Sequence, residues 1–310
     1  MSIFRTIAMF IYLFGYMIVH YGVLRRAERA LAAGNMQLVE ELVNKHIPHW
    51  SRGILKVTGV SLSVEGLENI PKDTPCVFVG NHRSYYDIPL LLASLDKPHG
   101  ILAKEELEKI PLLNRWMKLL GCVFVQRDDL RASVRALNDA TAIVESGKSF
   151  VIFPEGTRYK GEEGGAGEFK AGAFRIAVKT GVPVVPVALT GARALFEGNG
   201  NLCHPGSVHI KVLPPIRTEG MSKTEQKQLP DAVRQASLAQ QYASSPSQAA
   251  SRPACSPFWL RHLPPARGKS VKGRALGKTV YFAGTAKASH FGRGGIALAM
   301  TKRASPLPIY

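Results

Sequence analysis

A histidine and an aspartate five positions apart, His82 and Asp87, are the side chains in this sequence best suited to move a proton. They belong to the run from Asn81 to Pro89, which directly follows the apolar segment 76–79. An imidazole accepts a proton near neutral pH, and a carboxylate bonded to one ring nitrogen leaves the other free to do so. The pattern therefore predicts a general base with an acidic partner. Alternatively, Asp87 only caps a helix and His82 is a polar loop residue; the two roles of Asp87 are compatible.

A second polar loop, from Phe153 to Arg158, follows another apolar segment. The guanidinium of Arg158 and the backbone N–H groups around Gly156 suit a phosphate dianion, because arginine offers two parallel donors. Glu155 carries the same sign of charge as phosphate. We therefore expect Glu155 to accept a hydrogen bond from a substrate hydroxyl or to hold the loop in shape. The alternative is a glycine turn with a solvated ion pair.

Two further cations, Lys104 and Arg127, follow the apolar segments 101–103 and 122–125. Each is a candidate to bind phosphate. Most arginines in such positions pair with a carboxylate on the surface. These two positions are therefore candidates whose role the pattern alone leaves open.

Several common catalytic patterns are missing. The sequence has no G-x-S-x-G turn, and the segment 147–149 precedes an apolar strand, whereas a phosphate loop would follow one. The glycine-rich segment 161–167 lacks dinucleotide-binding spacing and predicts a mobile loop. Without an activated serine or cysteine, direct attack by a substrate hydroxyl is the simplest chemistry.

The elements that must position these loops alternate between strand and helix, which predicts an α/β fold with a mostly parallel central sheet flanked by helices. Active sites of such sheets lie at the carboxyl ends of the strands. Pro186, inside an apolar run, indicates an edge position or a bulge. The predicted strands cover residues 55–64, 76–79, 99–103, 122–125, 150–153, 182–189 and 207–213. The predicted helices cover residues 88–95, 112–120, 171–179 and a segment capped by Asp128 or Asp129 and ended by Gly147.

The N-terminus predicts a membrane anchor. Residues 6–24 contain no Asp, Glu, Lys or Arg, and a helix of this length extends about 28 Å, close to the hydrocarbon thickness of a bilayer. A second helix is predicted over residues 27–45. We expect residues 1–49 to form a membrane-associated helical hairpin, which spans the bilayer or lies in its surface, and residues 50–240 to form the α/β domain.

The net charge of +17 is uneven, because residues 232–310 contain 12 Lys or Arg and no Asp or Glu. Positive charge attracts nucleic acid, anionic lipid or acidic substrates, but no nucleic-acid-binding motif or paired-cysteine metal motif is present. We expect no nucleic-acid partner and no metal. Residues 241–310 form a basic, low-complexity tail that we expect to be disordered. The four cysteines are widely spaced, which indicates buried free thiols.

Taken in order, these motifs resemble those of the glycerolipid acyltransferase superfamily, most closely the bacterial 1-acylglycerol-3-phosphate acyltransferases. The resemblance covers residues 50–240. It rests on the pair His82 and Asp87, on the segments 121–127 and 153–158, and on the run 184–186. Gln126 and Tyr159 depart from the residues common in the family.

The resemblance implies transfer of a fatty acyl group from acyl-CoA or acyl-carrier protein to the sn-2 hydroxyl of 1-acylglycerol-3-phosphate (lysophosphatidate), giving phosphatidate. His82 would be the base and Asp87 its partner, with no cofactor beyond the acyl donor. The enzyme would contact membrane lipids at the cytoplasmic membrane, with its catalytic domain on the cytoplasmic side. Alternatives are an acyltransferase for glycerol-3-phosphate or another lysolipid, and a non-catalytic basic membrane-binding protein. The expected substrate-binding residues are Lys104, Arg127, Glu155, Gly156, Thr157 and Arg158.

Overall fold

Seven strands form one central sheet in the part of the chain that the structure, a computed structural model, describes: residues 1–95, 97, 99–126 and 129–243. All of these residues belong to the unit Met1–Phe258; the second unit, Trp259–Tyr310, and most of the predicted basic tail lie outside the described residues. The sheet order is β1-β7-β6-β2-β5-β3-β4. The strands are β1 (Val60–Glu65), β2 (Val77–Gly80), β3 (His99–Lys104), β4 (Val123–Val125), β5 (Ser149–Ile152), β6 (Val184–Thr190) and β7 (Gly206–Val212).

The pairing is parallel except between β6 and β7, so the prediction of a mostly parallel sheet is confirmed. In β2 and β5 every residue is buried, because helices cover both faces. Alternation along β2 sends Phe78 into one core and Val77 and Val79 into the other.

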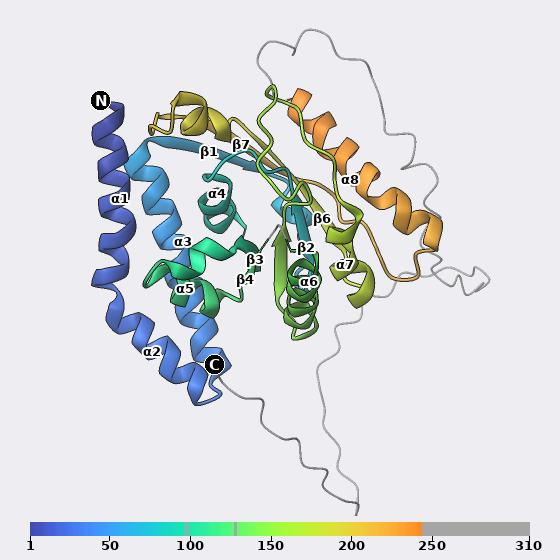
Figure 1. Cartoon of the computed structure of the whole chain (residues 1–310), viewed down its shortest axis with the longest axis horizontal. Helices are drawn as coiled ribbons and strands as arrows, with labels where there is room; N and C mark the ends of the chain where they lie inside the picture. Colours follow the sequence, from blue (N-terminus) through green and yellow to red (C-terminus); the bar gives the residue numbers. More distant parts are fainter. Residues whose placement is uncertain (96, 98, 127–128, 244–310) are drawn as a thin grey trace, which may run out of the picture. The chain divides into compact units, whose positions relative to one another are not determined.

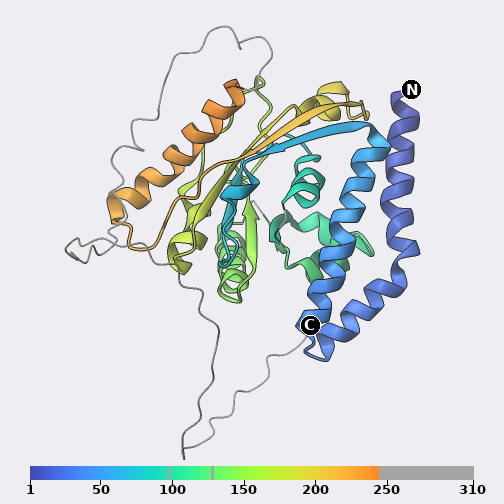
Figure 2. The ribbon, with the colours of Figure 1, turned by 180° about the vertical axis from the view of Figure 1, so that it is seen from behind.

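Each face of the sheet has its own set of helices (Figures 1 and 2). The first core gathers side chains from α1 to α5, and the second gathers them from α6, α7 and α8. The helices are α1 (Ser2–Val19), α2 (Tyr21–Ala32), α3 (Met36–Thr58), α4 (Asp87–Ser94), α5 (Leu113–Leu120), α6 (Leu130–Glu145), α7 (Arg175–Thr180) and α8 (Lys223–Ala243).

The N-terminal helices differ from the prediction in their bounds. The predicted helix 27–45 is divided between α2 and α3, because the Asn35 side chain accepts a hydrogen bond from Leu38 N and starts a new helix. α3 continues to Thr58 and ends at Gly59, whose φ of 73° favours glycine. The prediction of a strand from residue 55 is therefore wrong at its start. The predicted boundary between residues 49 and 50 falls inside α3.

The last helix, α8, was absent from the predicted elements. Its start carries a reciprocal cap, in which Ser222 N donates to Glu225 Oε2 at 2.7 Å and Glu225 N to Ser222 Oγ at 3.3 Å. Leu229 and Val233 recur at helical spacing and are buried in the second core. The signal was therefore present in the sequence, although its polar composition obscured it.

Pro186 lies in β6, which is an interior strand, so the expectation of an edge position is wrong. The expectation of a bulge agrees with the register. Between the pairs Val187–Val212 and Val184–Ile216, β6 advances three residues and the opposite chain four. The carbonyl of Pro186 accepts from Leu213 N at 2.9 Å, so the missing N–H faces this irregular segment.

The sheet has little room to spare at Gly100 in β3, the strand next to the edge strand β4. A Cβ there would lie 2.2 Å from the carbonyl oxygen of Gly121. We predict that Gly100→Ala lowers the free energy of unfolding by about 1–3 kcal/mol through overpacking, measured by urea denaturation. The matched control is Gly172→Ala, because a Cβ at Gly172 meets nothing within 4 Å. Equal urea midpoints for the two variants would contradict this account of the packing.

Candidate active site

Three loops meet at one edge of the sheet, where β2, β5 and β6 end. β2 lies between β5 and β6, and the three strands are parallel, so their carboxyl ends share this edge. The loop after β2 carries His82 and leads into α4, whose first residue is Asp87. The loops after β5 and β6 therefore lie on either side of it.

His82 and Asp87 are joined directly: His82 Nδ1 lies 2.8 Å from Asp87 Oδ2. The same oxygen accepts hydrogen bonds from Arg83 N at 2.6 Å and Ser84 N at 2.8 Å. An ionised carboxylate only accepts, so Nδ1 carries the ring proton and Nε2 presents a lone pair. Asp87 is fully buried and the His82 side chain is 11% exposed. This arrangement suits a general base.

The loop after β5 fixes His82 from three directions. The ring of His82 stacks on that of Phe153, with centroids 4.3 Å apart. Its backbone N–H donates to Glu155 Oε2 at 2.6 Å, and its carbonyl accepts from Tyr159 N at 2.8 Å. The imidazole is therefore held through both its side chain and its main chain.

Glu155 connects this loop to the loop of His82 and to the segment 161–167 through its two carboxylate oxygens. Its Oε1 accepts from Gly167 N at 3.0 Å while Oε2 holds His82, and burial raises the pKa of its carboxyl. Of the two roles expected for Glu155, these contacts match the one of holding the loop in shape. The N–H of Gly156, at a φ of 72°, donates to Phe153 O at 3.1 Å and so closes a turn.

The predicted phosphate-binding cations differ in how they lie relative to the loop of His82. Arg158 is partly exposed, and its guanidinium lies 3.7 Å above the ring centre of Tyr85, in the loop of His82. Thr157 is exposed beside it. Lys104 ends β3, which β5 separates from β2, and it pairs on the surface with Glu106. Arg127 lies outside the described residues.

Arg83 is an organising residue that the sequence analysis missed. It is 1% exposed, and its guanidinium donates to the carbonyls of Glu162 and Gly165 at 2.7 Å and of Gly161 at 2.9 Å. Arg234 of α8 binds the next two carbonyls, those of Ala166 and Gly167. Five of the seven carbonyls in the segment 161–167 therefore accept hydrogen bonds from these two arginines, whose planar guanidinium groups each bind several acceptors. This arrangement disagrees with the prediction of a mobile loop.

Glu197, in the loop after β6, was missed as well. It binds Arg158 Nη1 at 2.7 Å and also contacts Ser84 and Tyr85. Arg83 had a usable signal, since it stands inside the run that holds His82 and Asp87. Glu197 had none, because it is an isolated acid near glycines and asparagines.

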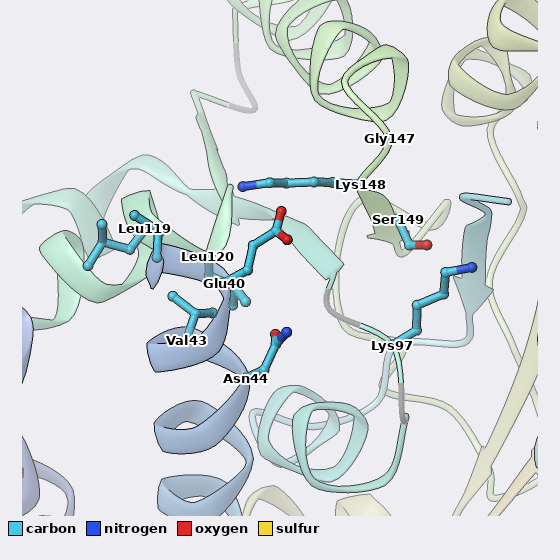
Figure 3. Close-up of a pocket in the computed structure, with 10 residues that line it drawn as sticks. Glu40, Val43, Asn44, Lys97, Leu119, Leu120, Gly147, Lys148 and Ser149 are labelled. Atoms are coloured by element: carbon cyan, nitrogen blue, oxygen red, sulfur yellow. The ribbon is translucent and has the colours of Figure 1, made fainter. Parts of the chain in front are cut away.

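A cavity of about 120 Å³ lies elsewhere, at the amino ends of the strands (Figure 3). It is lined by Glu40 from α3, by Lys97, and by Lys148 and Ser149 where β5 begins. His82 follows the opposite, carboxyl end of β2. This cavity is therefore separate from the His82 site.

The thiols offer no nucleophile in the part of the chain that the structure describes. Cys76, Cys122 and Cys203 are free and buried, and Cys255 lies outside the described residues. Burial raises the pKa of Cys76 to about 11 and that of Cys122 to about 12. Both thiols therefore stay protonated near neutral pH. Among the described residues, no group of three or more His, Cys, Asp or Glu is arranged to hold a metal ion.

Comparison with known proteins identifies the family of this chain. The family model described as Acyltransferase matches residues 61–190, the span that includes the loops of His82 and Arg158. The 1-acyl-sn-glycerol-3-phosphate acyltransferase of Borreliella burgdorferi is 34% identical over 180 residues, covering 58% of this chain and 71% of that protein. The chain belongs to the acyltransferase family.

Two other likenesses add detail. The crystal structure of the 1-acyl-sn-glycerophosphate acyltransferase PlsC from Thermotoga maritima matches with a TM-score of 0.64 and 34% identity, covering 79% of this chain and all of that one. The chloroplastic 1-acyl-sn-glycerol-3-phosphate acyltransferase of Brassica napus is 42% identical over 155 residues, which cover 49% of this chain. The matched part spans less than half of that plant protein, 44%.

The role of Arg83 is open to a direct test. We predict that Arg83→Met lowers the free energy of unfolding by roughly 3 kcal/mol or more, because it leaves several carbonyls without their buried donor. Hydrogen exchange of the amides in residues 161–167 should accelerate more than that of β2. Arg175→Met, at an exposed arginine, is the matched control. Unchanged exchange in segment 161–167 would show that Arg83 does not hold it.

Proposed function

We propose that this chain transfers a fatty acyl group from acyl-CoA or acyl-carrier protein to the sn-2 hydroxyl of 1-acylglycerol-3-phosphate, producing phosphatidate for phospholipid synthesis. One observation carries the proposal: His82 Nδ1 is bound to buried Asp87, while Nε2 makes no hydrogen bond to any residue that the structure describes. The names of the relatives from Borreliella burgdorferi and Thermotoga maritima support the choice of acceptor.

In the proposed reaction, His82 Nε2 takes the proton of the acceptor hydroxyl as that oxygen attacks the thioester carbonyl. An ester C–O bond forms, the C–S bond breaks, and the imidazolium returns the proton to the departing thiolate. Asp87 stabilises the imidazolium between these two steps. The transfer involves no oxidation or reduction, so it needs no redox cofactor, and we propose the acyl donor as the one co-substrate.

The acceptor would be held by its phosphate. Arg158 is the expected residue that lies beside the loop of His82, stacked on Tyr85. Binding the phosphate there would make attack by the hydroxyl effectively intramolecular, which is a large source of rate. Lys104 and Arg127 remain candidates for the same phosphate, and Gly156 and Thr157 for contacts along the loop.

Loss of the base gives the first functional prediction. We expect His82→Ala to reduce thiol release from acyl-CoA in the presence of lysophosphatidate by about 10² or more. His204→Ala is the matched control, because the His204 side chain makes no hydrogen bond to any residue that the structure describes. Equal turnover by the His82→Ala and wild-type proteins would end the proposed mechanism.

The membrane would be reached through α1. This helix is the one described helix that is long and apolar enough to cross a bilayer, and only 11% of its residues are buried. One side packs on the domain, where Cys203 N donates to Thr6 Oγ1 at 2.8 Å and Trp50 Nε1 to Leu13 O at 3.4 Å. The other side exposes apolar side chains at helical spacing: Phe4, Ile7, Ile11, Phe14 and Ile18.

Because α1 keeps one side on α3, as Figure 1 shows, we place it in the surface of the cytoplasmic membrane with its apolar side among the lipids. The catalytic domain would face the cytoplasm, where acyl-CoA and acyl-carrier protein are found. The buried free thiols fit that reducing compartment.

A triple variant tests this placement. We predict that Ile7→Ser, Ile11→Ser and Phe14→Ser together reduce binding to phosphatidylglycerol vesicles at least 10-fold, since each buried apolar side chain contributes roughly 1.5–3 kcal/mol. Vesicle flotation is the measurement. Val134→Ser with Leu202→Ser, at exposed apolar positions elsewhere, is the control. Unchanged flotation of the triple variant would move the membrane contact to another part of the chain.

A further inference from the structure

The carboxylate of Glu197 joins two loops that the proposed reaction requires to act together. Its Oε1 accepts from Arg158 Nη1 at 2.7 Å and from Tyr85 N at 2.8 Å. Its Oε2 accepts from Ser84 Oγ at 2.6 Å. Ser84 and Tyr85 belong to the loop of His82, whereas Arg158 belongs to the loop after β5. The Glu197 side chain is 9% exposed, so water competes little for these bonds.

Arg158 is held on two sides and open on a third. Glu197 binds Nη1, and the ring of Tyr85 covers one face of the guanidinium at 3.7 Å. The remaining edge, formed by Nε and Nη2, makes no hydrogen bond or ion pair with the residues that the structure describes. The side chain is 31% exposed. That edge offers the two parallel N–H donors that a phosphate accepts.

We propose that Glu197 is a positioning residue: it fixes Arg158 against the loop of His82, so that a phosphate bound on the free edge of Arg158 places the acceptor hydroxyl at His82. This inference rests on the proposed function and deepens it. Glu197 itself does not touch the substrate. It acts by removing the freedom of a long arginine side chain before the acceptor arrives, which lowers the entropy lost on binding.

A carboxylate near a phosphate site also repels the phosphate, and repulsion and positioning change the KM for lysophosphatidate in opposite directions. Repulsion between like charges weakens phosphate binding, so if repulsion dominated, removing Glu197 would lower the KM for lysophosphatidate. If positioning dominates, removing it raises this KM. Three short contacts and the stacked ring favour positioning.

The experiment compares Glu197→Ala with Glu197→Gln in the thiol-release assay. We expect Glu197→Ala to raise the KM for lysophosphatidate about 10-fold, with a smaller change in kcat, because the lost contact orients the phosphate group. Glu197→Gln keeps an oxygen for Arg158 and Tyr85, and its amide can donate to Ser84 Oγ. It should therefore recover a KM within about threefold of the wild type. Glu168→Ala, at an exposed acid, is the control.

A double variant separates positioning from a merely structural role. In an Arg158→Ala background, adding Glu197→Ala should leave the KM unchanged, because the group that Glu197 positions is already gone. A further multiplicative rise in KM, an unchanged KM in Glu197→Ala alone, or a lowered KM would each overturn the inference. If Glu197→Ala fails to fold, Glu197→Asp, which shortens the reach by one methylene, takes its place with the same expected rise.

Thiol release by the wild-type protein distinguishes a failure of the proposed function from a failure of the role of Glu197. Absence of thiol release with lysophosphatidate and acyl-CoA or acyl-carrier protein would contradict the function itself. Normal wild-type turnover together with a wild-type KM in Glu197→Ala would overturn only the role of Glu197.

Discussion

The bond between His82 Nδ1 and Asp87 Oδ2 constrains the whole carboxyl edge of the sheet. A buried carboxylate is costly unless donors satisfy it, and Asp87 Oδ2 accepts from the imidazole and from two backbone N–H groups of its own loop. The buried Oδ1 has no hydrogen-bond partner among the residues that the structure describes. The backbone N–H of His82 in the same loop is also buried and needs an acceptor from another part of the chain. Glu155 supplies this contact by accepting from His82 N. The dyad and the loop after β5 therefore stabilise each other.

The sheet makes this mutual support possible because β2 lies between β5 and β6. Loops from three strands then converge at one end of the sheet, and both faces of the sheet are sealed by separate cores. The buried strands fix where each loop starts. Short polar contacts between the loops fix where each side chain ends.

Patterns that are local in sequence were predictable, and contacts between distant segments were not. The alternation of strands and helices gave the parallel sheet, and five positions separate His82 from Asp87, so their meeting depends on a single turn. The start of β1 was misread because apolar residues at the end of α3 also fit strand alternation, although Ile54, Leu55 and Thr58 are buried at helical spacing. The partners of Arg83 and of Glu197 depend on tertiary packing and have no local signal.

The distance along the chain between the partners in this site has a consequence for biosynthesis. Glu197 follows its partner Ser84 by 113 residues, and Glu155 follows its partner His82 by 73. At about 5–20 residues per second, a ribosome needs several seconds or more to translate the interval between Ser84 and Glu197. The loop of His82 is therefore made well before the residues that hold it in place. A nascent chain that ends before Glu197 holds the imidazole and its acid but lacks the full set of restraints, so the complete arrangement of the three loops forms only after residue 197 has been made.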